Sequence, residues 1–398
     1  MLIHLRKVNI VPMDCMTPLQ LAARGGHTSV VELLVENGAL IRVITTRFTT
    51  ALHFAVQGGH TSTVELLIKK GASVKGSDYT FPGPDPASLA LRDGYPSILE
   101  LFHEATGLHR SMAGLGEGKN TPLHIAAQGG HIKMVKQILQ EGAQINVRNE
   151  DNYTPLHLAT LGGHTRTVEL LLKKGALIEA VSIRDSTPLH LAAQNGHTRV
   201  VAVLLKIGAS TDARNWYHNT PLHLAAESGH TNTAELLLGR GALTKALNMF
   251  KHTPLHLAAQ NGHTRTAELL LEKGASIDSK GDYNTGCPLD NLTMGTSWQI
   301  GGYSPLHLAA RSGHTSTAEL LLNKGASTEV MDRDENTPLH LAAQNGHTSM
   351  AELLLRKDDT STFKVNSFGK TPSCVAEEYG HSDIATLLWC YPWPYQPR

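Results

Sequence analysis

The chain has 398 residues, and its 35 lysines and arginines balance its 35 aspartates and glutamates, so the formal net charge is zero. That balance gives no sign of a polyanionic partner, and we expect neither nucleic acid nor an acidic membrane surface among the partners. No apolar run is long enough to span a membrane, and the first six residues lack the apolar core of a signal peptide. We therefore expect a soluble protein of the cytoplasm or the nucleus.

One short motif, Thr-Pro-Leu-His-Leu-Ala at Thr154 to Ala159, returns with small changes along the chain. Between Thr121 and Thr253 its copies start at 121, 154, 187, 220 and 253, which are steps of 33 positions. The same step separates two further pairs of copies, and two weaker copies bring the total to eleven. The copies begin at Thr17, Thr50, Asp85, Thr121, Thr154, Thr187, Thr220, Thr253, Ser304, Thr337 and Thr371. Such a period indicates a stack of repeated modules.

Each copy predicts two short helices joined by a turn. In the copy at Thr154, threonine is a good N-cap, and the proline that follows suits the first helical position, where its missing N–H costs nothing. The first helix ends at Gly162, and the second runs from Thr165 to about Lys173. Helices this short are marginally stable alone, so we expect neighbouring repeats to bury a continuous core together.

The order Thr-Pro-Leu-His-Leu-Ala-Ala, then Gly-His, then Leu-Leu-Leu-x-x-Gly-Ala resembles the ankyrin repeat, and the resemblance covers roughly residues 17–389. It implies an all-α, L-shaped ankyrin-repeat solenoid of about eleven helix-turn-helix units. It also implies that hairpin-like finger loops project from the connections between repeats. The resemblance says little about which partner is bound.

In chain order, an N-terminal flank at 1–16 precedes repeats 1 and 2 at 17–75. A degenerate repeat 3 at 76–120 still stacks but lies between flexible joints rich in glycine and proline, so any hinge belongs there. The regular repeats 4–8 at 121–275 predict the stiffest part.

The step from Thr253 to Ser304 is 51 positions, 18 more than 33, which places an 18-residue insertion in the finger connection at 276–303. The insertion is either tolerated surface loop or a binding loop that carries Trp298. Repeats 9–11 at 304–389 include a C-terminal cap with a polar outer side. The Pro/aromatic tail at 390–398 either packs on that cap or serves as a short extended ligand.

Two departures from the family pattern concern the fingers and the second helices. The family usually has glycine two residues before the motif, in a turn that needs positive φ, whereas this chain has Asn152, Asp185, His218, Lys251 and Glu335. Lysine and glutamate tolerate that conformation poorly, so those two fingers are expected to be strained or differently shaped. In the second helices, Thr167, Thr233, Thr266 and Thr317 replace the usual Val or Ile. We expect each of these hydroxyls to bond the carbonyl one turn back.

Histidine and cysteine are the residues that could suggest metal chemistry. Of the 23 histidines, 18 belong to the repeat, eight in Thr-x-x-His or Ser-x-x-His and ten in Gly-His. We interpret them as structural groups that bond local backbone and hydroxyl groups, because a metal site needs converging ligands. The four cysteines are far apart, which favours reduced thiols. No catalytic or nucleotide-binding motif is present, so we expect no catalytic residue, metal or cofactor, and no enzyme activity.

The candidate protein-binding residues lie on two surfaces. Large aromatic side chains on projecting turns are natural interface anchors, although packing between adjacent fingers is an equal alternative. The resemblance to ankyrin repeats implies that the first helix of each repeat, the inner helix, faces a concave groove with its C-terminal end. Ordinary solvation would explain the polarity of these helix ends equally well. The finger candidates are Tyr153, Arg184, Trp216, Tyr217 and Phe250, and the inner-helix candidates are Gln194, Asn195, Glu227, Gln260, Asn261 and Arg311.

These features predict a non-catalytic intracellular scaffold or adaptor, a monomer whose concave face and finger tips bind another protein. One alternative is a cytosolic ankyrin fragment of a larger channel or signalling protein. Another is a substrate-recognition subunit of a degradation complex, which would need a further helix after Trp389, where nine residues remain. An enzyme would need a second domain.

Overall fold

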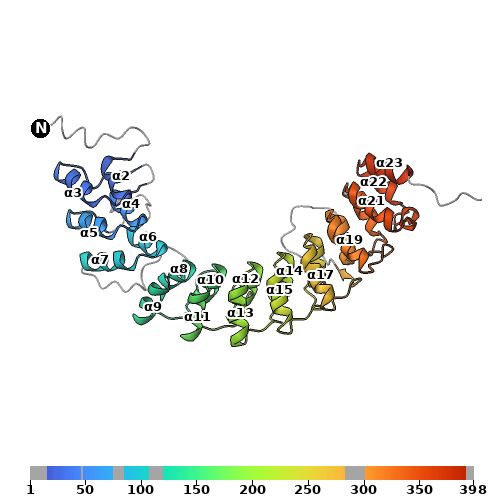
Figure 1. Cartoon of the computed structure of the whole chain (residues 1–398), viewed down its shortest axis with the longest axis horizontal. Coiled ribbons are helices and arrows are strands. Elements are labelled where there is room, and N and C mark those ends of the chain that lie inside the picture. The colour runs from blue at the N-terminus through green and yellow to red at the C-terminus, as the bar shows by residue number, and fades with distance from the viewer. Residues whose placement is uncertain (1–15, 46–47, 75–84, 107–119, 283–300, 391–398) are drawn as a thin grey trace, which may run out of the picture. The chain divides into compact units, whose positions relative to one another are not determined.

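A computed structural model describes residues 16–45, 48–74, 85–106, 120–282 and 301–390 (Figure 1). Within them the chain is all-α apart from one two-stranded ladder, and 22 α-helices form eleven consecutive pairs. The all-α architecture of about eleven repeats is therefore confirmed. The packing of the helices divides the chain into two compact arrays, Met1–Ile183 and Arg184–Arg398.

The first array contains repeats 1–5, each made of a short inner helix and a longer outer helix. Its helices are α2 (Pro18–Arg24), α3 (Thr28–Glu36), α4 (Ala51–Gln57), α5 (Thr61–Lys69), α6 (Pro86–Asp93), α7 (Pro96–Thr106), α8 (Pro122–Gln128), α9 (Ile132–Gln140), α10 (Pro155–Leu161) and α11 (Thr165–Lys173). The degenerate repeat 3 is the pair α6 and α7, and α6 packs against both α4 and α8. The prediction that this repeat still stacks is confirmed.

The second array contains repeats 6–11 and the ladder. Its elements are α12 (Pro188–Gln194), α13 (Thr198–Ile207), α14 (Pro221–Glu227), α15 (Thr231–Leu238), α16 (Pro254–Gln260), α17 (Thr264–Glu272), β1 (Gly281–Asp282), β2 (Gly301–Tyr303), α18 (Pro305–Ser312), α19 (Thr315–Asn323), α20 (Pro338–Gln344), α21 (Thr348–Lys357), the 3₁₀ helix η2 (Thr360–Phe363), α22 (Pro372–Glu378) and α23 (Ser382–Cys390). The segment boundaries expected from the sequence stay a prediction. The flank, both joints of repeat 3, most of the insertion with Trp298, and the tail after Cys390 lie outside the described residues.

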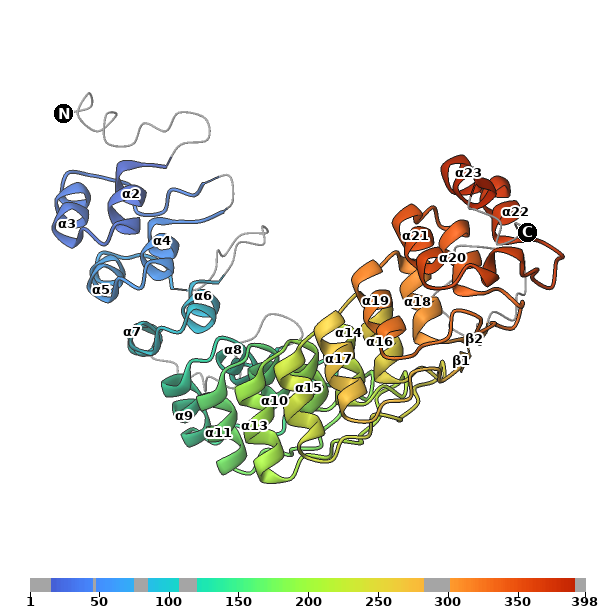
Figure 2. The ribbon, with the colours of Figure 1, turned by 45° about the vertical axis from the view of Figure 1, so that its right-hand side comes forward.

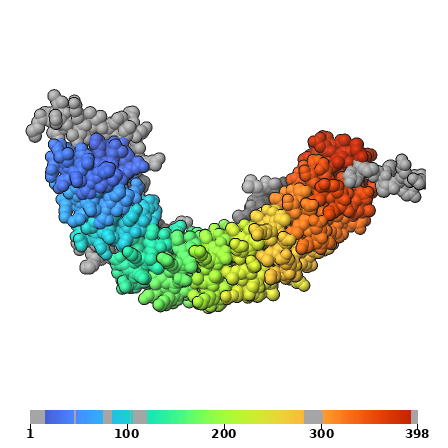
Figure 3. Space-filling view, in the orientation of Figure 1, coloured from blue at the N-terminus to red at the C-terminus, as the bar shows by residue number. Residues whose placement is uncertain are grey.

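Inner helices pack on inner helices and outer helices on outer helices. In Figure 2, α16 and α18 lie side by side, as do α17 and α19. Alanines make this close approach possible, since Ala258 and Ala259 on α16 and Ala309 and Ala310 on α18 are fully buried. Within the second array, the colours of the space-filling surface follow one another in chain order without a gap (Figure 3). Each repeat therefore completes the core of its sequential neighbours.

Threonine side chains connect the first turns of neighbouring outer helices. The hydroxyls of Thr198 and Thr233 are 2.9 Å apart, and the equivalent pairs are Thr231 with Thr266 at 2.8 Å and Thr264 with Thr317 at 2.7 Å. The expectation that Thr233, Thr266 and Thr317 bond the carbonyl one turn back is therefore wrong. Their partner is a hydroxyl of the preceding repeat. Thr167 is buried too, but the preceding repeat has Ile132 in place of the partner threonine.

The finger that contains the insertion is closed by the two strands on either side of it. Strands β1 and β2 pair antiparallel, with Gly281 opposite Tyr303, and close the finger at the base of the insertion. The Thr264–Thr317 bond joins residues 53 positions apart, whereas the Thr231–Thr266 bond joins residues 35 apart, a difference of 18. The predicted 18-residue length is confirmed, and the insertion leaves the contact between repeats 8 and 9 in place.

The residues that replace the finger glycine all adopt positive φ, as the sequence predicts. The φ angles are 58° at Asn152, 54° at Asp185, 57° at His218, 52° at Lys251 and 58° at Glu335, and Phe48, which the sequence analysis missed, has 58°. The fingers at Lys251 and Glu335 therefore have the common turn, so the expectation of a different shape is wrong. The other part of that expectation, strain, still applies, because a left-handed backbone conformation costs free energy in residues that carry a Cβ.

Replacing Glu335 with glycine is expected to raise the free energy of unfolding by about 0.5–1 kcal/mol. The left-handed conformation costs a non-glycine residue about 1–2 kcal/mol, and the extra entropy of an unfolded glycine removes part of the gain. The measurement is urea denaturation of the full chain. Asn152→Gly is the control and should gain less, because asparagine tolerates this conformation. A loss of stability in Glu335→Gly would contradict the argument that the backbone of Glu335 is strained.

Candidate functional site

The motif histidines are held by hydrogen bonds on both ring nitrogens. In repeat 6 the Thr187 N–H donates to His190 Nδ1 at 3.2 Å, and His190 Nε2 lies 2.9 Å from the carbonyl oxygen of Asn219 in the following finger. Because the backbone N–H can only donate, Nδ1 is the acceptor and Nε2 carries the proton. Equivalent Nε2 contacts of 3.0 Å are made by His223, His256, His307 and His340. The predicted structural role is confirmed.

The Gly-His histidines form a second series, which points toward the preceding repeat. His230 Nε2 lies 3.1 Å from the carbonyl oxygen of Gln194, and His263 Nε2 lies 2.9 Å from that of Glu227. The rings of His230 and His263 cover Gly196 and Gly229, which have positive φ, and a Cβ at Gly313 would come within 2.7 Å of the His347 ring. Both series therefore connect neighbouring repeats. Among the described residues, no group of three or more His, Cys, Asp or Glu could hold a metal ion.

Burial keeps the motif histidines neutral. It lowers the pKa of His190, His223, His256, His307 and His340 to about 4, because removing water disfavours the imidazolium more than the carbonyl contacts favour it. The pKa of one carboxyl shifts in the opposite direction, since burial raises the pKa of Asp332 to about 6. In the motif histidines, a proton on Nδ1 would also remove the acceptor for the N–H of the N-cap threonine. The neutral tautomer is therefore part of the fold.

His340→Leu is expected to lower the free energy of unfolding by about 2–4 kcal/mol, because the Thr337 N–H and the Lys370 carbonyl both lose their partner. His340→Gln should cost less than about 1 kcal/mol. Repeat 1 shows why, since Gln20 Oε1 accepts from the Thr17 N–H at 2.8 Å and Gln20 Nε2 donates to the Val43 carbonyl at 3.0 Å. Thermal melts of both variants measure the difference, and equal losses would contradict the argument.

Acid should destabilise the protein as the pH falls from about 6.5 to about 4. In that window the histidines of the unfolded chain bind protons, whereas the five folded histidines with a pKa of about 4 stay neutral. The free energy of unfolding therefore decreases as the pH decreases. Asp332, whose pKa of about 6 lies above its ordinary value, opposes this trend, but it is one group against five. Urea midpoints at pH 7, 5.5 and 4.5 test this, and a midpoint that rises toward pH 4.5 would contradict it.

The finger candidates of the second array lie on tips that are bonded to one another. The Trp216 N–H donates to the Arg184 carbonyl at 2.9 Å, and the Met249 N–H donates to the Tyr217 carbonyl at 3.0 Å. Asparagines fix each turn from inside. Asn215 Oδ1 accepts from the Tyr217 N–H at 3.0 Å, and its equivalent Asn248 accepts from the Phe250 N–H at 3.0 Å. The tips are thus held in place before any partner arrives.

The aromatic candidates differ in exposure. Trp216 is 59% exposed, whereas Tyr217 and Phe250 are half-buried, and the Phe250 ring is tilted against His252 with centroids 6.3 Å apart. Leu247 and Met249 on the same finger are 43% and 37% exposed. We define the finger patch as the exposed side chains of two neighbouring fingers, Arg214, Trp216, Lys245, Leu247 and Met249. Arg184 is exposed beside it.

The inner-helix candidates form a row at the C-terminal ends of α12, α14, α16 and α18. Gln194, Asn195, Glu227, Asn261 and Arg311 are exposed, and Gln260 is half-buried. Asn195 and Asn261 each donate an amide hydrogen to their own helix, to the Leu191 carbonyl at 2.8 Å and the Leu257 carbonyl at 2.9 Å. Partial loss of water raises the pKa of the Glu227 carboxyl above its ordinary value. This inner-helix row therefore presents amides around one carboxylate and one guanidinium.

Two tyrosines are placed differently from the finger patch. Tyr153 belongs to the first array, where it is half-buried and packs against His157 with ring centroids 5.6 Å apart. Tyr303, at the end of the finger connection that holds the insertion, is buried against Leu308 and Leu341. Strand β2 directs its ring toward α18, where the Arg311 guanidinium lies 5.9 Å from the ring centroid.

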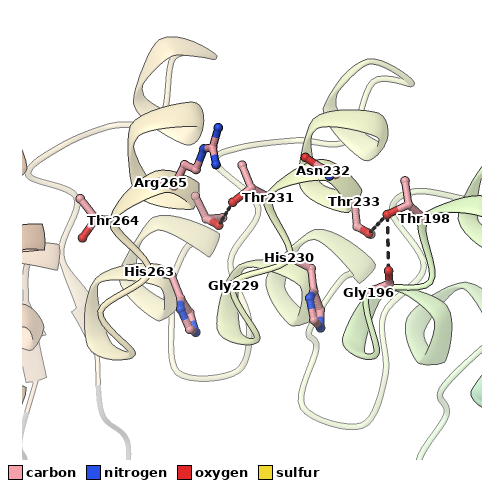
Figure 4. Close-up of a pocket in the computed structure, with 11 residues that line it drawn as sticks. Gly196, Thr198, Gly229, His230, Thr231, Asn232, Thr233, His263, Thr264 and Arg265 are labelled. Atoms are coloured by element: carbon pink, nitrogen blue, oxygen red, sulfur yellow. Dashed lines mark hydrogen bonds between the residues drawn. The ribbon is translucent and has the colours of Figure 1, made fainter.

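An open, polar cavity of about 470 Å³ follows the first turns of α13, α15 and α17 (Figure 4). Thr198, Thr231 and Thr264 open these helices, and Asn232 and Arg265 project near them. Arg265 is the one Lys, Arg, Asp or Glu residue among those that line the cavity. Those histidines bond the carbonyls of Gln194 and Glu227, so the cavity lies beside the inner-helix row. It offers hydroxyl and guanidinium donors to a polar partner.

Sequence reasoning missed the cavity residues Asn232 and Arg265. Their signal was present, because the second residue of each outer helix changes from repeat to repeat, from Arg199 to Asn232 to Arg265, while the threonine before it recurs. A variable polar position beside a recurring one marks a surface that stacking does not restrain.

Two remaining sequence features complete the description of the surface. Among the described residues, no helix is long and apolar enough to cross a membrane. Cys374 and Cys390 are exposed free thiols, and Cys15 and Cys287 lie outside the described residues.

Helix pairs stacked in register, with preformed fingers and polar inner-helix ends, define a repeat solenoid whose exposed surfaces suit binding. The family comparison agrees. A profile described as "Ankyrin repeats (3 copies)" matches residues 2–78, 87–182, 177–248, 242–332 and 306–392, and the chain belongs to the ankyrin-repeat family. This fold is generally a non-catalytic protein-binding module.

Curated relatives match parts of the chain. The Ankyrin repeat and KH domain-containing protein mask-1 of Caenorhabditis elegans is 33% identical over 125 residues, which are 31% of this chain and 4% of that protein. The E3 ubiquitin-protein ligase XBAT32 of Arabidopsis thaliana is 32% identical over 153 residues, which are 32% of this chain and 30% of that protein. The chain thus spans less than a third of the length of either relative.

A solved structure supports the same fold. The crystal structure of the human ASB11 ankyrin repeat domain superimposes with a TM-score of 0.52 and 29% sequence identity, covering 60% of this chain and 98% of that one.

Proposed function

We propose that this protein is a non-catalytic scaffold or adaptor that binds a protein partner through the finger patch and the inner-helix row of its second array. The observation that carries the proposal is the exposure of Trp216 on a tip that backbone bonds already fix. A large ring on a preformed tip buries much area at small entropic cost. The polar row beside the cavity supplies hydrogen bonds for register.

Several properties follow as parts of the same proposal. The protein acts in the cytoplasm or nucleus as a monomer, its partners are proteins and not nucleic acids, and it catalyses no reaction. The balanced formal charge of zero and the absence of catalytic and nucleotide-binding motifs from the sequence support these points.

Trp216→Ala with Met249→Ala is expected to lower recovery of a partner in affinity capture by about tenfold or more, because truncating exposed anchors removes the hot spot of an interface. The thermal melt should stay unchanged, since both side chains project into solvent. Phe250 is left intact because its ring packs on His252.

The matched control for this experiment is Ile207→Ala, which removes a side chain that is 55% exposed at the end of an outer helix. Mass spectrometry identifies the proteins recovered with the wild type and each variant. Equal recovery with the double variant and the wild type would remove the finger patch from the proposal.

A second candidate function is substrate recognition in a ubiquitin ligase, which the similarity to the E3 ubiquitin-protein ligase XBAT32 favours. Under this alternative, the captured proteins would include ubiquitin-ligase components, and the partner would gain ubiquitin in a reconstituted reaction. A third is that the chain is the cytosolic ankyrin part of a larger channel or signalling protein. Mapping of the full-length transcript tests that alternative.

A further inference from the structure

Exposure alternates along the two fingers that form the finger patch. Every second residue is exposed, and these are Ser210, Asp212, Arg214, Trp216 and His218 on one finger and Leu243, Lys245, Leu247, Met249 and Lys251 on the next. The Arg214 Nη1 lies 3.4 Å from the Leu247 carbonyl, which brings the two fingers side by side at the middle of the patch. A partner that meets one finger therefore meets both.

Charge is distributed unevenly along the fingers of the second array. Residues 209–219 and 242–252 contain the cations Arg214, Lys245 and Lys251 but one carboxylate, Asp212. The equivalent stretch 326–336 has the opposite balance, with one cation, Arg333, and four acidic residues, Glu329, Asp332, Asp334 and Glu335. The finger row thus has a basic part at 209–252 and an acidic part at 326–336, although the whole chain is neutral.

The cations of the patch form no ion pair within the described residues. Among the described residues, the ion pairs of the second array join Lys364 to Glu329 and Lys370 to Glu378, and none involves Arg214 or Lys245. Both side chains are exposed, with apolar Trp216, Leu247 and Met249 between and beside them. Paired cations around an apolar centre fit carboxylates around an apolar side chain.

We propose that the finger patch binds an acidic protein segment that carries a large apolar side chain. The apolar side chain packs on Trp216, Leu247 and Met249, and its flanking carboxylates meet Arg214 and Lys245. The acidic stretch 326–336 repels the same segment, so the segment binds the basic part of the finger row at 209–252. This inference rests on the proposed function and names the chemistry of the partner.

A nucleic acid is the other polymer that an aromatic and basic surface could take. The acidic stretch and the zero net charge weigh against it, because binding to a phosphate backbone needs a continuous basic track.

The test is selection of a random 12-residue phage-displayed peptide library on the full chain. Selected peptides should carry net negative charge and at least one aromatic residue, leucine or methionine. Their affinity, measured by fluorescence anisotropy, should fall about tenfold with Trp216→Ala and with Lys245→Glu, and fall as salt rises. The control Lys273→Glu makes the same charge change at the exposed C-cap of α17 and should leave affinity unchanged.

Several outcomes would overturn the inference. They are selected peptides that are neutral or basic, no enrichment at all, acidic peptides that bind the Trp216 and Lys245 variants as tightly as the wild type, and a labelled 20-nucleotide single-stranded DNA whose binding those variants abolish. Lys245 makes no hydrogen bond in the described structure, so its variant keeps the test informative even if Trp216→Ala loses stability.

Failure of the inference is distinguishable from failure of the proposed function. If the captured natural partner is lost with Trp216→Ala and Met249→Ala while the selected peptides are not acidic, the binding function stands and the partner chemistry is wrong. If the capture does not respond to those substitutions, the patch itself is wrong.

Discussion

A neutral imidazole that accepts on one nitrogen and donates on the other is the interaction on which this structure depends. The inner helices have seven or eight residues, too few to be stable alone, and each needs its first N–H groups satisfied and its neighbours held. His190 does both, since Nδ1 caps its own helix and Nε2 reaches the next finger. A carboxylate could accept but not donate, and a lysine could donate but not accept. The abundance of histidine therefore follows from stacking and requires no catalysis.

Because backbone, histidine and threonine contacts hold the stack, the exposed positions are released from that task. Trp216 and Met249 make their local backbone contacts through their N–H groups, so their side chains can vary without changing the finger. The same holds for Gln194 and Glu227, whose carbonyls accept from the histidines of the next repeat while their side chains face solvent. Stability and recognition thus use different atoms of the same residues.

Much of the fold could be predicted from the sequence, because period, capping and turn chemistry are local. The eleven repeats, the insertion length and the positive φ at Asn152 and Asp185 all follow from spacing and from what each turn requires. The partner of Thr233 could not be predicted, because it depends on which residues face each other across two helices, and Thr198 is 35 positions away. The burial of Tyr303 and the half-burial of Phe250 depend on the same three-dimensional detail. The cavity at Asn232 and Arg265 needs three aligned helix ends, which no single repeat contains.

The contacts between repeats have a consequence for how the length of such a chain can change. In regular repeats, each motif histidine reaches a carbonyl 29 positions ahead, and each paired threonine reaches a hydroxyl 35 positions away. When one complete repeat is removed or duplicated, each histidine and threonine still meets the equivalent atom of the neighbouring repeat. Removing any other number of residues from a helix displaces both sets of partners. The chain can therefore become longer by duplication, or shorter by deletion, of whole repeats. The insertion in the finger of repeat 8 is the permitted exception, since it adds residues where no partner is displaced.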